Sequence, residues 1–338
     1  MHTKRPSGWS RREILRVSGT LGAAMATGWP PRTAGALEKV RMACWSQPIS
    51  EQANVFAAQE FGWFKEQGLD FEFVPGAGGG EALKHVLAGN ADFAFTNVEP
   101  ILFGVEQGAQ LQVVYNIYPK NVFNVVSLKA KGIRKPQDLK GKRIGVYSMA
   151  SGTRHNLLVI LHSVGLKESD AEVVAAGVLN FGPLIEGKVD ATAATDTGLW
   201  AARQRGLGEV NVIWAREYLD IPTDVFAVRA ETMQRQPGII PRFLRAYRKG
   251  SQWMLDNPEK AAELALKYAT DGQDVKRNLE IIKIRNASSV SEGTKRHGLG
   301  WFDMDVLRKV AKTYLELGLL KRPVDVDSLF TNRFVQEL

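Results

Sequence analysis

Strand-like and helix-like patterns alternate along the first third of this chain of 338 residues. The connections between them are short, and several contain a glycine, such as Gly68 and Gly89, which can take the left-handed conformation that ends a helix. Regular alternation of this kind predicts an α/β fold, in which a mostly parallel sheet is covered by helices. The predicted strands span 40–45, 71–74, 92–95 and 111–118, and the predicted helices span 52–67, 81–87 and 100–107.

The same alternation begins again after residues 121–128, and the chain becomes largely helical past residues 223–229. This pattern predicts a second, smaller sheet followed by a helical C-terminal part. Its predicted strands span 142–147, 189–194 and 210–214, and its predicted helices span 151–164, 198–205, 241–256, 258–268, 275–284 and 304–317.

Two α/β halves, one inserted into the other, predict two lobes that are joined by two crossings of the chain. We expect these crossings near 118–126 and 218–228. The first lobe would comprise 37–120 and 226–338, including the C-terminal helices, and the inserted lobe would comprise 121–225.

The N-terminal 36 residues resemble a targeting segment. Arg11 and Arg12 precede a moderately apolar run at 17–28, and the small residues Ala34-Gly35-Ala36 follow it. A paired arginine, an apolar run and an Ala-x-Ala site predict a twin-arginine export signal that is cleaved after Ala36. A membrane anchor or a basic tail is the alternative, but a run of about a dozen residues is short of the ~20 that a membrane span needs. We therefore expect the mature protein in the periplasm.

The charge of the chain is concentrated in this segment. The chain holds 44 Lys and Arg against 36 Asp and Glu, a formal net charge of +8. Six of the basic residues and one of the acidic residues lie in residues 1–36, so the remainder carries about +3. No basic run is interleaved with aromatic residues, and we therefore expect no nucleic-acid binding.

A single cysteine, Cys44, excludes an internal disulfide and any site built from several cysteines. It lies in an apolar run, which predicts a buried thiol. Lipid attachment is disfavoured because Arg41 stands where a lipidation motif needs an aliphatic residue.

Several stretches resemble one family of periplasmic binding proteins, those that serve ABC importers for nitrate, for taurine and alkylsulfonates, and for thiamine-pyrimidine precursors. They occur in the family's order and are FAAQEFGWFKEQGLD at 56–70, AGNADFA at 88–94, DLKGKRIGV at 138–146, EGKVDA at 186–191, FLRAY at 243–247 and NPEKA at 257–261. The resemblance covers nearly all of the chain after residue 36. It implies a type II fold with two lobes, each a mainly parallel sheet flanked by helices, and a ligand cleft between them.

The resemblance also implies a function. Such a receptor captures a small solute by hinged closure of its lobes and delivers it to an inner-membrane permease that has a cytoplasmic ATPase. A monomer without a cofactor is expected. An exported sensor domain for a signalling partner is the main alternative, and an exported enzyme on the same fold is a second one.

Ligand contacts are expected where strands end and helices begin, because free helix N–H groups point outward at that edge of an α/β sheet. In the resembling family the corresponding loops line the cleft. The expected ligand-binding residues are Trp45, Ser46, Gln47, Gly78, Gly79, Thr96, Asn97, Glu99, Ser148, Ser151, Gly152, Thr153, Asn180, Phe181, Asp196 and Trp200.

These residues leave two kinds of ligand open. The glycines at 76–80 and the hydroxyl-rich turn at 151–153 suit a sulfonate or carboxylate, although a flexible turn and an ordinary helix cap would look the same. Aromatic residues such as Trp45 can stack on a flat ring, and Glu99 and Asp196 can accept hydrogen bonds from its amino groups. That combination suits a nitrogenous heteroaromatic, such as a pyrimidine precursor.

No catalytic signature is evident. His155 and His162 are seven residues apart on one predicted helix, which separates them by ~10 Å and prevents joint ligation of one metal ion. Some relatives of the fold synthesise the thiamine pyrimidine and carry a cysteine-rich motif for that reaction, whereas this chain has one cysteine. We therefore expect a binding protein with no catalytic residue and no metal site.

Overall fold

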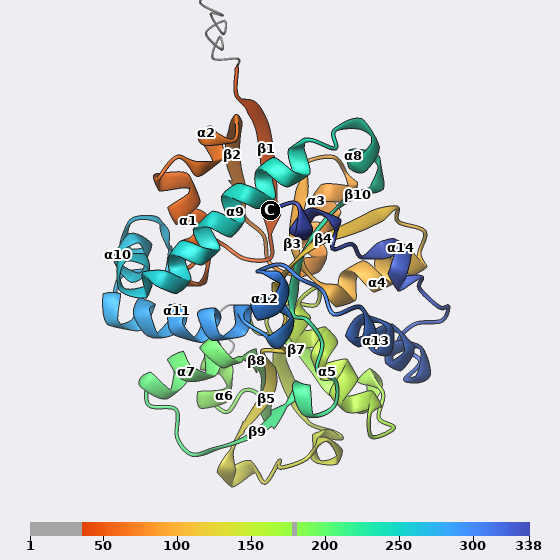
Figure 1. Cartoon of the computed structure of the whole chain (residues 1–338). Coiled ribbons are helices and arrows are strands. Elements are labelled where there is room, and N and C mark those ends of the chain that lie inside the picture. The colour runs from red at the N-terminus through yellow and green to blue at the C-terminus, as the bar shows by residue number, and fades with distance from the viewer. Residues whose placement is uncertain (1–35, 178–180) are drawn as a thin grey trace, which may run out of the picture. The chain divides into compact units, whose positions relative to one another are not determined.

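Two five-stranded sheets organise the computed structural model, which describes residues 36–177 and 181–338 (Figure 1). The strand order is β2-β1-β3-β10-β4 in the first sheet and β7-β6-β8-β5-β9 in the second. The strands are β1 (Glu38–Cys44), β2 (Leu69–Val74), β3 (Phe93–Asn97), β4 (Leu111–Tyr118), β5 (Phe123–Leu128), β6 (Arg143–Val146), β7 (Glu172–Ala175), β8 (Ala191–Thr195), β9 (Val210–Trp214) and β10 (Asp224–Arg229).

Both sheets are mixed, in the same way. Four strands of each sheet run in one direction, and the fifth, β10 in the first sheet and β5 in the second, pairs antiparallel with both of its neighbours. The prediction of mainly parallel sheets is therefore confirmed, with one exception in each. In each sheet, the antiparallel strand is the first one that the chain forms after it has left the other sheet.

The helices follow the predicted order, but one predicted helix is divided and several short elements are additional. The helix expected at 52–67 is interrupted because Gly62 takes a φ of 74°, which separates α1 from α2. Strand β7 and the short helices α6, α8, α12, α14 and α15 were not predicted. The helices are α1 (Ala53–Glu60), α2 (Trp63–Glu66), α3 (Gly79–Leu87), α4 (Val98–Glu106), α5 (Gly152–His162), α6 (Gly182–Ile185), α7 (Asp196–Gln204), α8 (Ala230–Arg235), α9 (Ile239–Asp256), α10 (Pro258–Tyr268), α11 (Val275–Ser289), α12 (Glu292–His297), α13 (Met304–Glu316), α14 (Val326–Leu329) and α15 (Arg333–Gln336).

Alternation along the strands decides which helices cover each face of the first sheet. In β3, Phe93 and Phe95 pack on the side of α1, α2 and α9, whereas Ala94 packs on the side of α3, α4 and α13. Successive strand residues point to opposite faces, so two separate cores form on the two sides of this sheet. The large rings lie on the α9 side and the smaller residue on the other.

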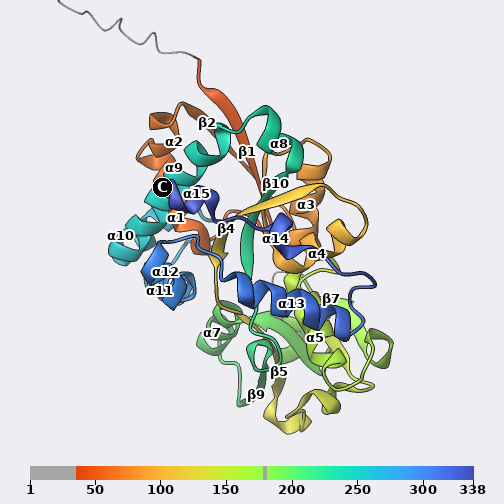
Figure 2. The same ribbon diagram turned by 45° about the vertical axis from the view of Figure 1, so that its right-hand side comes forward.

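The second sheet is built by the same rule. In β5, Val125 packs against α5, and Val126 packs against the side that holds α6 and α7 (Figure 1). The end of α13 lies beside α5 (Figure 2), where the His162 Nδ1 atom is 2.7 Å from the carbonyl oxygen of Leu317. The C-terminal helices therefore contact elements of both sheets.

The predicted export signal lies outside the described residues apart from Ala36, and it stays a prediction, as do the boundaries of the two predicted lobes. In the part of the chain that the structure describes, no helix combines the length and the apolar character that a membrane crossing requires.

Phe243 of α9 allows a test of the aromatic-rich core between α9 and the first sheet. Its side chain is fully buried and stacks on Phe93, with ring centroids 3.9 Å apart. Phe243→Ala should lower the free energy of unfolding by about 3–5 kcal/mol, because it leaves a ring-sized cavity. Denaturant unfolding measures this, with Phe61→Ala as the control, since Phe61 is 46% exposed. The control should cost about 1 kcal/mol or less, and equal losses in the two variants would contradict the packing described here.

Candidate functional site

A cavity of about 550 Å³ lies where the strands of both sheets end. Strand β1 leads into Trp45, Ser46 and Gln47, and β3 ends at Asn97, all of which line the cavity. The antiparallel strands begin at this same edge. Asp224, the first residue of β10, pairs with Asn97, and Phe123, the first residue of β5, pairs with Thr195 at the end of β8. Both sheets therefore contribute residues to the lining of one cavity.

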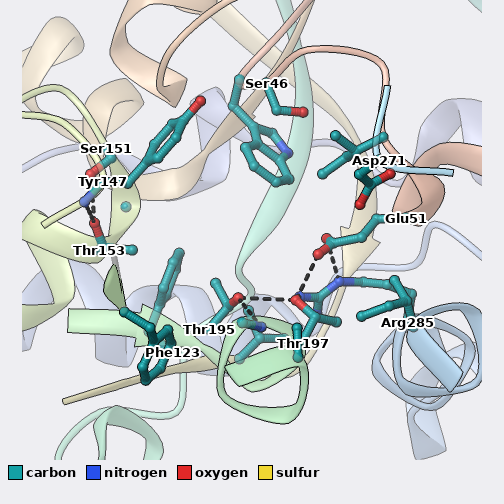
Figure 3. A pocket seen from close by; sticks show the side chains of 18 of the residues that line it. Ser46, Glu51, Phe123, Tyr147, Ser151, Thr153, Thr195, Thr197, Asp271 and Arg285 are labelled. Atoms are coloured by element: carbon teal, nitrogen blue, oxygen red, sulfur yellow. Dashed lines mark hydrogen bonds and ion pairs between the residues drawn. The ribbon is translucent and has the colours of Figure 1, made fainter. Parts of the chain in front are cut away.

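Four aromatic residues belong to the lining of the cavity. Trp45 comes from the first sheet, and Phe123, Tyr147 and Phe181 come from the second. Figure 3 shows Phe123 and Tyr147 on one side of the cavity and Glu51 on the opposite side. Flat apolar surfaces of this kind offer a large contact area to a planar ring.

Asp224 supplies a buried acid at the edge of the first sheet. It is 3% exposed, and the Asn97 Nδ2 atom donates a hydrogen bond of 2.5 Å to its Oδ1 atom. Burial raises the pKa of Asp224 well above its usual range, and although the charge of Arg285 opposes this shift, that of Glu51 adds to it. Burial thus favours the protonated form of Asp224, in which a carboxyl group can both donate and accept a hydrogen bond.

Glu51 and Arg285 face each other on the other side of the cavity (Figure 3). The Arg285 Nε atom donates to the Glu51 Oε2 atom at 2.6 Å, and the Arg285 Nη2 atom lies 2.9 Å from the Asp196 Oδ1 atom. Thr197 joins the group because its hydroxyl accepts from Arg285 at 2.8 Å and donates to Glu51 at 2.6 Å. A second pair, Arg277 and Asp271, lies 3.0 Å apart.

The glycine loop before α3 has little capacity left for an anion. The backbone N–H groups of Gly76, Gly78 and Gly80 donate to the carbonyl oxygens of Ser46, Trp45 and Ala150, and the N–H of Ala77 donates to Glu81. The glycines instead permit close packing: a Cβ atom on Gly79 would lie 2.5 Å from the Asn97 Oδ1 atom. Most of the N–H groups of this loop are therefore engaged within the protein, and contact of the loop with a ligand stays a prediction.

The hydroxyl-rich turn at the start of α5 is similarly occupied. The Ser151 hydroxyl donates to the carbonyl oxygen of Ser148 at 2.6 Å and lies 2.7 Å from the Thr153 hydroxyl. The Thr153 hydroxyl accepts from the N–H of Tyr147 at 2.9 Å. These hydroxyls hold the loop together, and neither caps the helix.

The structure brings most of the predicted ligand-binding residues to the cavity. Those that line it are Trp45, Ser46, Gln47, Gly78, Gly79, Asn97, Ser151, Gly152, Thr153 and Phe181. Whether they contact a ligand stays a prediction.

Five predicted residues lie away from the lining, and each has a structural role or another position. Thr96 donates to the carbonyl oxygen of Gly79, Ser148 donates to that of Ala77, and Asp196 pairs with Arg285. Glu99 is 1% exposed and accepts from Asn156 of α5, and Trp200 lies further along α7. Asn180 lies outside the described residues.

Other lining residues were missed. Phe123 and Asp224 begin antiparallel strands, which an expectation of parallel strands does not place at this edge. Glu51 lies on a short 3₁₀ helix (Ser50–Gln52), and Arg285 comes from α11, more than 230 residues further along the chain. No local pattern in the sequence marks either one.

The described lining contains no lysine, histidine or cysteine. His155 is 7% exposed and packs on Phe103, and burial lowers the pKa of its ring to about 3. Cys44 is fully buried, as predicted, and burial raises the pKa of its thiol to about 12. Among the described residues, no three His, Cys, Asp or Glu side chains are grouped so that they could hold a metal ion.

Two mixed α/β sheets around a cavity at their shared strand ends define the periplasmic binding protein fold. The alkanesulfonate-binding protein SsuA from Xanthomonas axonopodis pv. citri, solved with MOPS bound, has this fold. It matches with a TM-score of 0.68 and 16% identity, over 87% of this chain and 98% of that one.

The chain belongs to the NMT1/THI5 like family, whose model matches residues 49–261. The riboflavin-binding protein RibY of Chloroflexus aurantiacus is 26% identical over 327 residues, which cover 94% of this chain and 92% of RibY. The 4-amino-5-hydroxymethyl-2-methylpyrimidine phosphate synthase THI5 of Saccharomyces cerevisiae is 25% identical over 232 residues, 64% of this chain and 66% of that protein. The resemblance inferred from the sequence is confirmed at the level of the family.

The pH dependence of stability tests whether the buried carboxyl group of Glu99 keeps its proton in the folded protein. Burial raises its pKa from 4.5 to about 7. The unfolded chain loses this proton above about pH 4.5, whereas the folded chain keeps it to about pH 7, so in that window the free energy of unfolding falls as the pH rises. The fall should reach about 1.4 kcal/mol per pH unit, and Glu99→Gln, which stays neutral, should remove it.

Denaturant unfolding between pH 4.5 and pH 7 measures this difference. Glu263→Gln on exposed α10 is the matched control and should follow the wild type. Parallel curves for the wild type and Glu99→Gln would show that Glu99 is ionised in the folded protein.

Proposed function

We propose that this protein is the solute receptor of an ABC importer and that its ligand is a planar nitrogen heterocycle. The observation that carries this proposal is the set of aromatic residues, Trp45, Phe123, Tyr147 and Phe181, that both sheets place around one cavity. Rings on the two sides can stack on a flat ligand at low cost in conformational entropy.

The size of the cavity supports this class of ligand. About 550 Å³ is within the ~300–1,000 Å³ typical of pockets for drug-sized molecules, and it exceeds what nitrate or taurine would fill. A single pyrimidine ring or a fused ring system of flavin size can be enclosed. Asp224, held by Asn97, would then face a ring nitrogen or an amino group and donate or accept one hydrogen bond.

The relatives support the same chemistry. RibY is named for binding riboflavin, and THI5 is named for forming a pyrimidine, so both names refer to nitrogen heterocycles. A ring held between residues of both sheets would favour the arrangement in which the sheets approach each other. The predicted lobes would close in this way about the two crossings, and the closed receptor would dock on its permease.

Binding without catalysis is the second part of the proposal. THI5 is named as a synthase, but the described lining here offers no lysine, histidine or cysteine as a nucleophile or base. We further propose that the protein is exported by the twin-arginine route, is cleaved after Ala36 and acts as a monomer in the periplasm.

Thermal unfolding of the purified protein with a ligand panel tests the proposed class. The panel holds riboflavin, lumazine, 4-amino-5-hydroxymethyl-2-methylpyrimidine, taurine, an alkylsulfonate and nitrate. A heterocycle at 100 times its Kd should add about 2.7 kcal/mol to the free energy of unfolding and raise the midpoint. Stabilisation by the sulfonates or nitrate alone would overturn the ligand class, and chemical conversion of the bound heterocycle would overturn the non-enzymatic role.

Trp45 and Trp200 form a matched pair for locating the site, because only Trp45 lines the cavity. Trp45→Ala should weaken binding of the stabilising heterocycle about tenfold or more, since it removes a stacking surface. Trp200→Ala should change the Kd by less than about twofold. Isothermal titration of both variants measures this, and a loss confined to Trp200→Ala would place the ligand elsewhere.

A further inference from the structure

We propose that Arg205 holds an oxyanion of the ligand at the solvent-exposed end of the cavity, so that the bound solute carries a planar ring and an acidic group on a flexible arm. This inference rests on the proposed function, because it assigns a second feature to the ligand of the same cavity. The acidic group is a phosphate, a carboxylate or a sulfonate, since each of them offers oxygen atoms to a guanidinium.

One face of α7 lines the cavity over about two turns. Gly198, Ala201, Ala202 and Arg205 belong to the lining, and their spacing of i, i+3, i+4 and i+7 places them on one side of the helix. Gly198 lies at the aromatic end, because a Cβ atom on it would lie 3.4 Å from the Phe181 ring. Arg205 follows the last residue of α7 and lies ~10 Å further along the helix axis. The lining therefore extends from aromatic rings to a guanidinium.

The lining also offers apolar contacts for the arm of such a ligand. Ala201 and Ala202 lie on α7 between the two ends of this face. Ile185 of α6 also lines the cavity, although it is 52% exposed. Carbon atoms of an arm that pack on these side chains would remove apolar surface from water, which stabilises the complex.

Arg205 differs from the other two arginines of the lining in its charge partners. Arg277 pairs with Asp271 at 3.0 Å, and Arg285 pairs with Glu51 at 2.6 Å. Arg205 is exposed, and its side chain forms no ion pair or hydrogen bond with any other residue that the structure describes. Its N–H groups are therefore available to a ligand.

The third acid of the lining does not supply a partner for Arg205. Asp224 is 3% exposed at the start of β10 in the first sheet, where it accepts a hydrogen bond from Asn97. An oxyanion beside Arg205 would meet a positive charge that no acid of the described lining neutralises. Because Arg205 is exposed, the oxyanion would also keep part of its hydration, which limits the cost of binding it.

A purely structural role for Arg205 would have a different consequence. A cation near the C-terminus of a helix interacts favourably with the helix dipole, and this interaction needs no ligand. Arg203 offers the same interaction from the last turn of α7, but it does not belong to the lining. Arg203→Gln and Arg205→Gln therefore remove the same charge from the same end of one helix, and only Arg205→Gln should alter recognition of an acidic group.

Probes that share a ring and differ in an acidic group test this site. The pairs are riboflavin with riboflavin 5′-phosphate, 4-amino-5-hydroxymethyl-2-methylpyrimidine with its phosphate, and lumazine with lumazine-6-carboxylate. The ring that stabilises the protein in the panel decides which pair is used. Isothermal titration of the wild type should show the acidic member binding about fivefold more tightly, as expected of a solvent-exposed ion pair.

The variants and the salt dependence should locate this preference. Arg205→Gln should abolish it, Arg205→Lys should keep part of it, and Arg203→Gln should leave it unchanged. Raising the salt concentration from about 0.1 M to about 1 M shortens the Debye length from about 10 Å to about 3 Å, and it should reduce the preference of the wild type.

The ratio of the two dissociation constants distinguishes the outcomes. A wild type that binds the neutral member equally or more tightly would overturn the oxyanion site and leave the role as a solute receptor intact. An unchanged preference in Arg205→Gln would overturn the role of Arg205. A wild type that binds no heterocycle of the panel would overturn the proposed function itself.

Discussion

Each sheet of this protein depends on one strand that the chain contributes after crossing from the other sheet. Strands β5 and β10 are those strands, and each pairs antiparallel with two neighbours. Because they run against the rest, they begin at the edge where the other strands end. The crossing segments, the first residues of both strands and the loops after β1, β3 and β6 are thereby gathered around one cavity. The position of the cavity therefore depends on the directions of the strands and not on which side chains line it.

The two crossings are also tied to each other. The Thr223 N–H donates to the carbonyl oxygen of Tyr118 at 2.8 Å, and the Thr223 hydroxyl donates to that of Lys120 at 2.6 Å. The Asn121 Nδ2 atom donates to the carbonyl oxygen of Leu219 at 2.9 Å. These hydrogen bonds hold the two crossings side by side at the edge of the cavity.

Local patterns in the sequence predicted the order of strands and helices. The spacing of apolar residues and the positions of glycines depend on the structure of each segment by itself. They also located the loops after the parallel strands that line the cavity, including Trp45 and Asn97. They could not reveal Asp224 or Arg285, which reach the cavity through strand direction and through packing of α11. Neither could they show that the N–H groups of the glycine loop were already engaged, since that depends on contacts with Trp45 and Ala150. The sequence shows which groups can donate hydrogen bonds, but only the tertiary structure shows which of these donors already have an acceptor within the protein.

Glu99 likewise shows that the type of a residue and its position after a strand do not determine its role. As an acid after a strand it suits recognition of an amino group, yet it lies behind the cavity and accepts a hydrogen bond of 2.5 Å from Asn156. The Asn121 Nδ2 atom in turn donates to the Asn156 Oδ1 atom at 2.9 Å. This series of hydrogen bonds joins α4, which packs on the first sheet, to α5, which packs on the second sheet, and to one of the crossings. A buried acid can be retained there because its partners are polar and its proton is kept, and removing either condition would leave a charge without hydration between the two sheets.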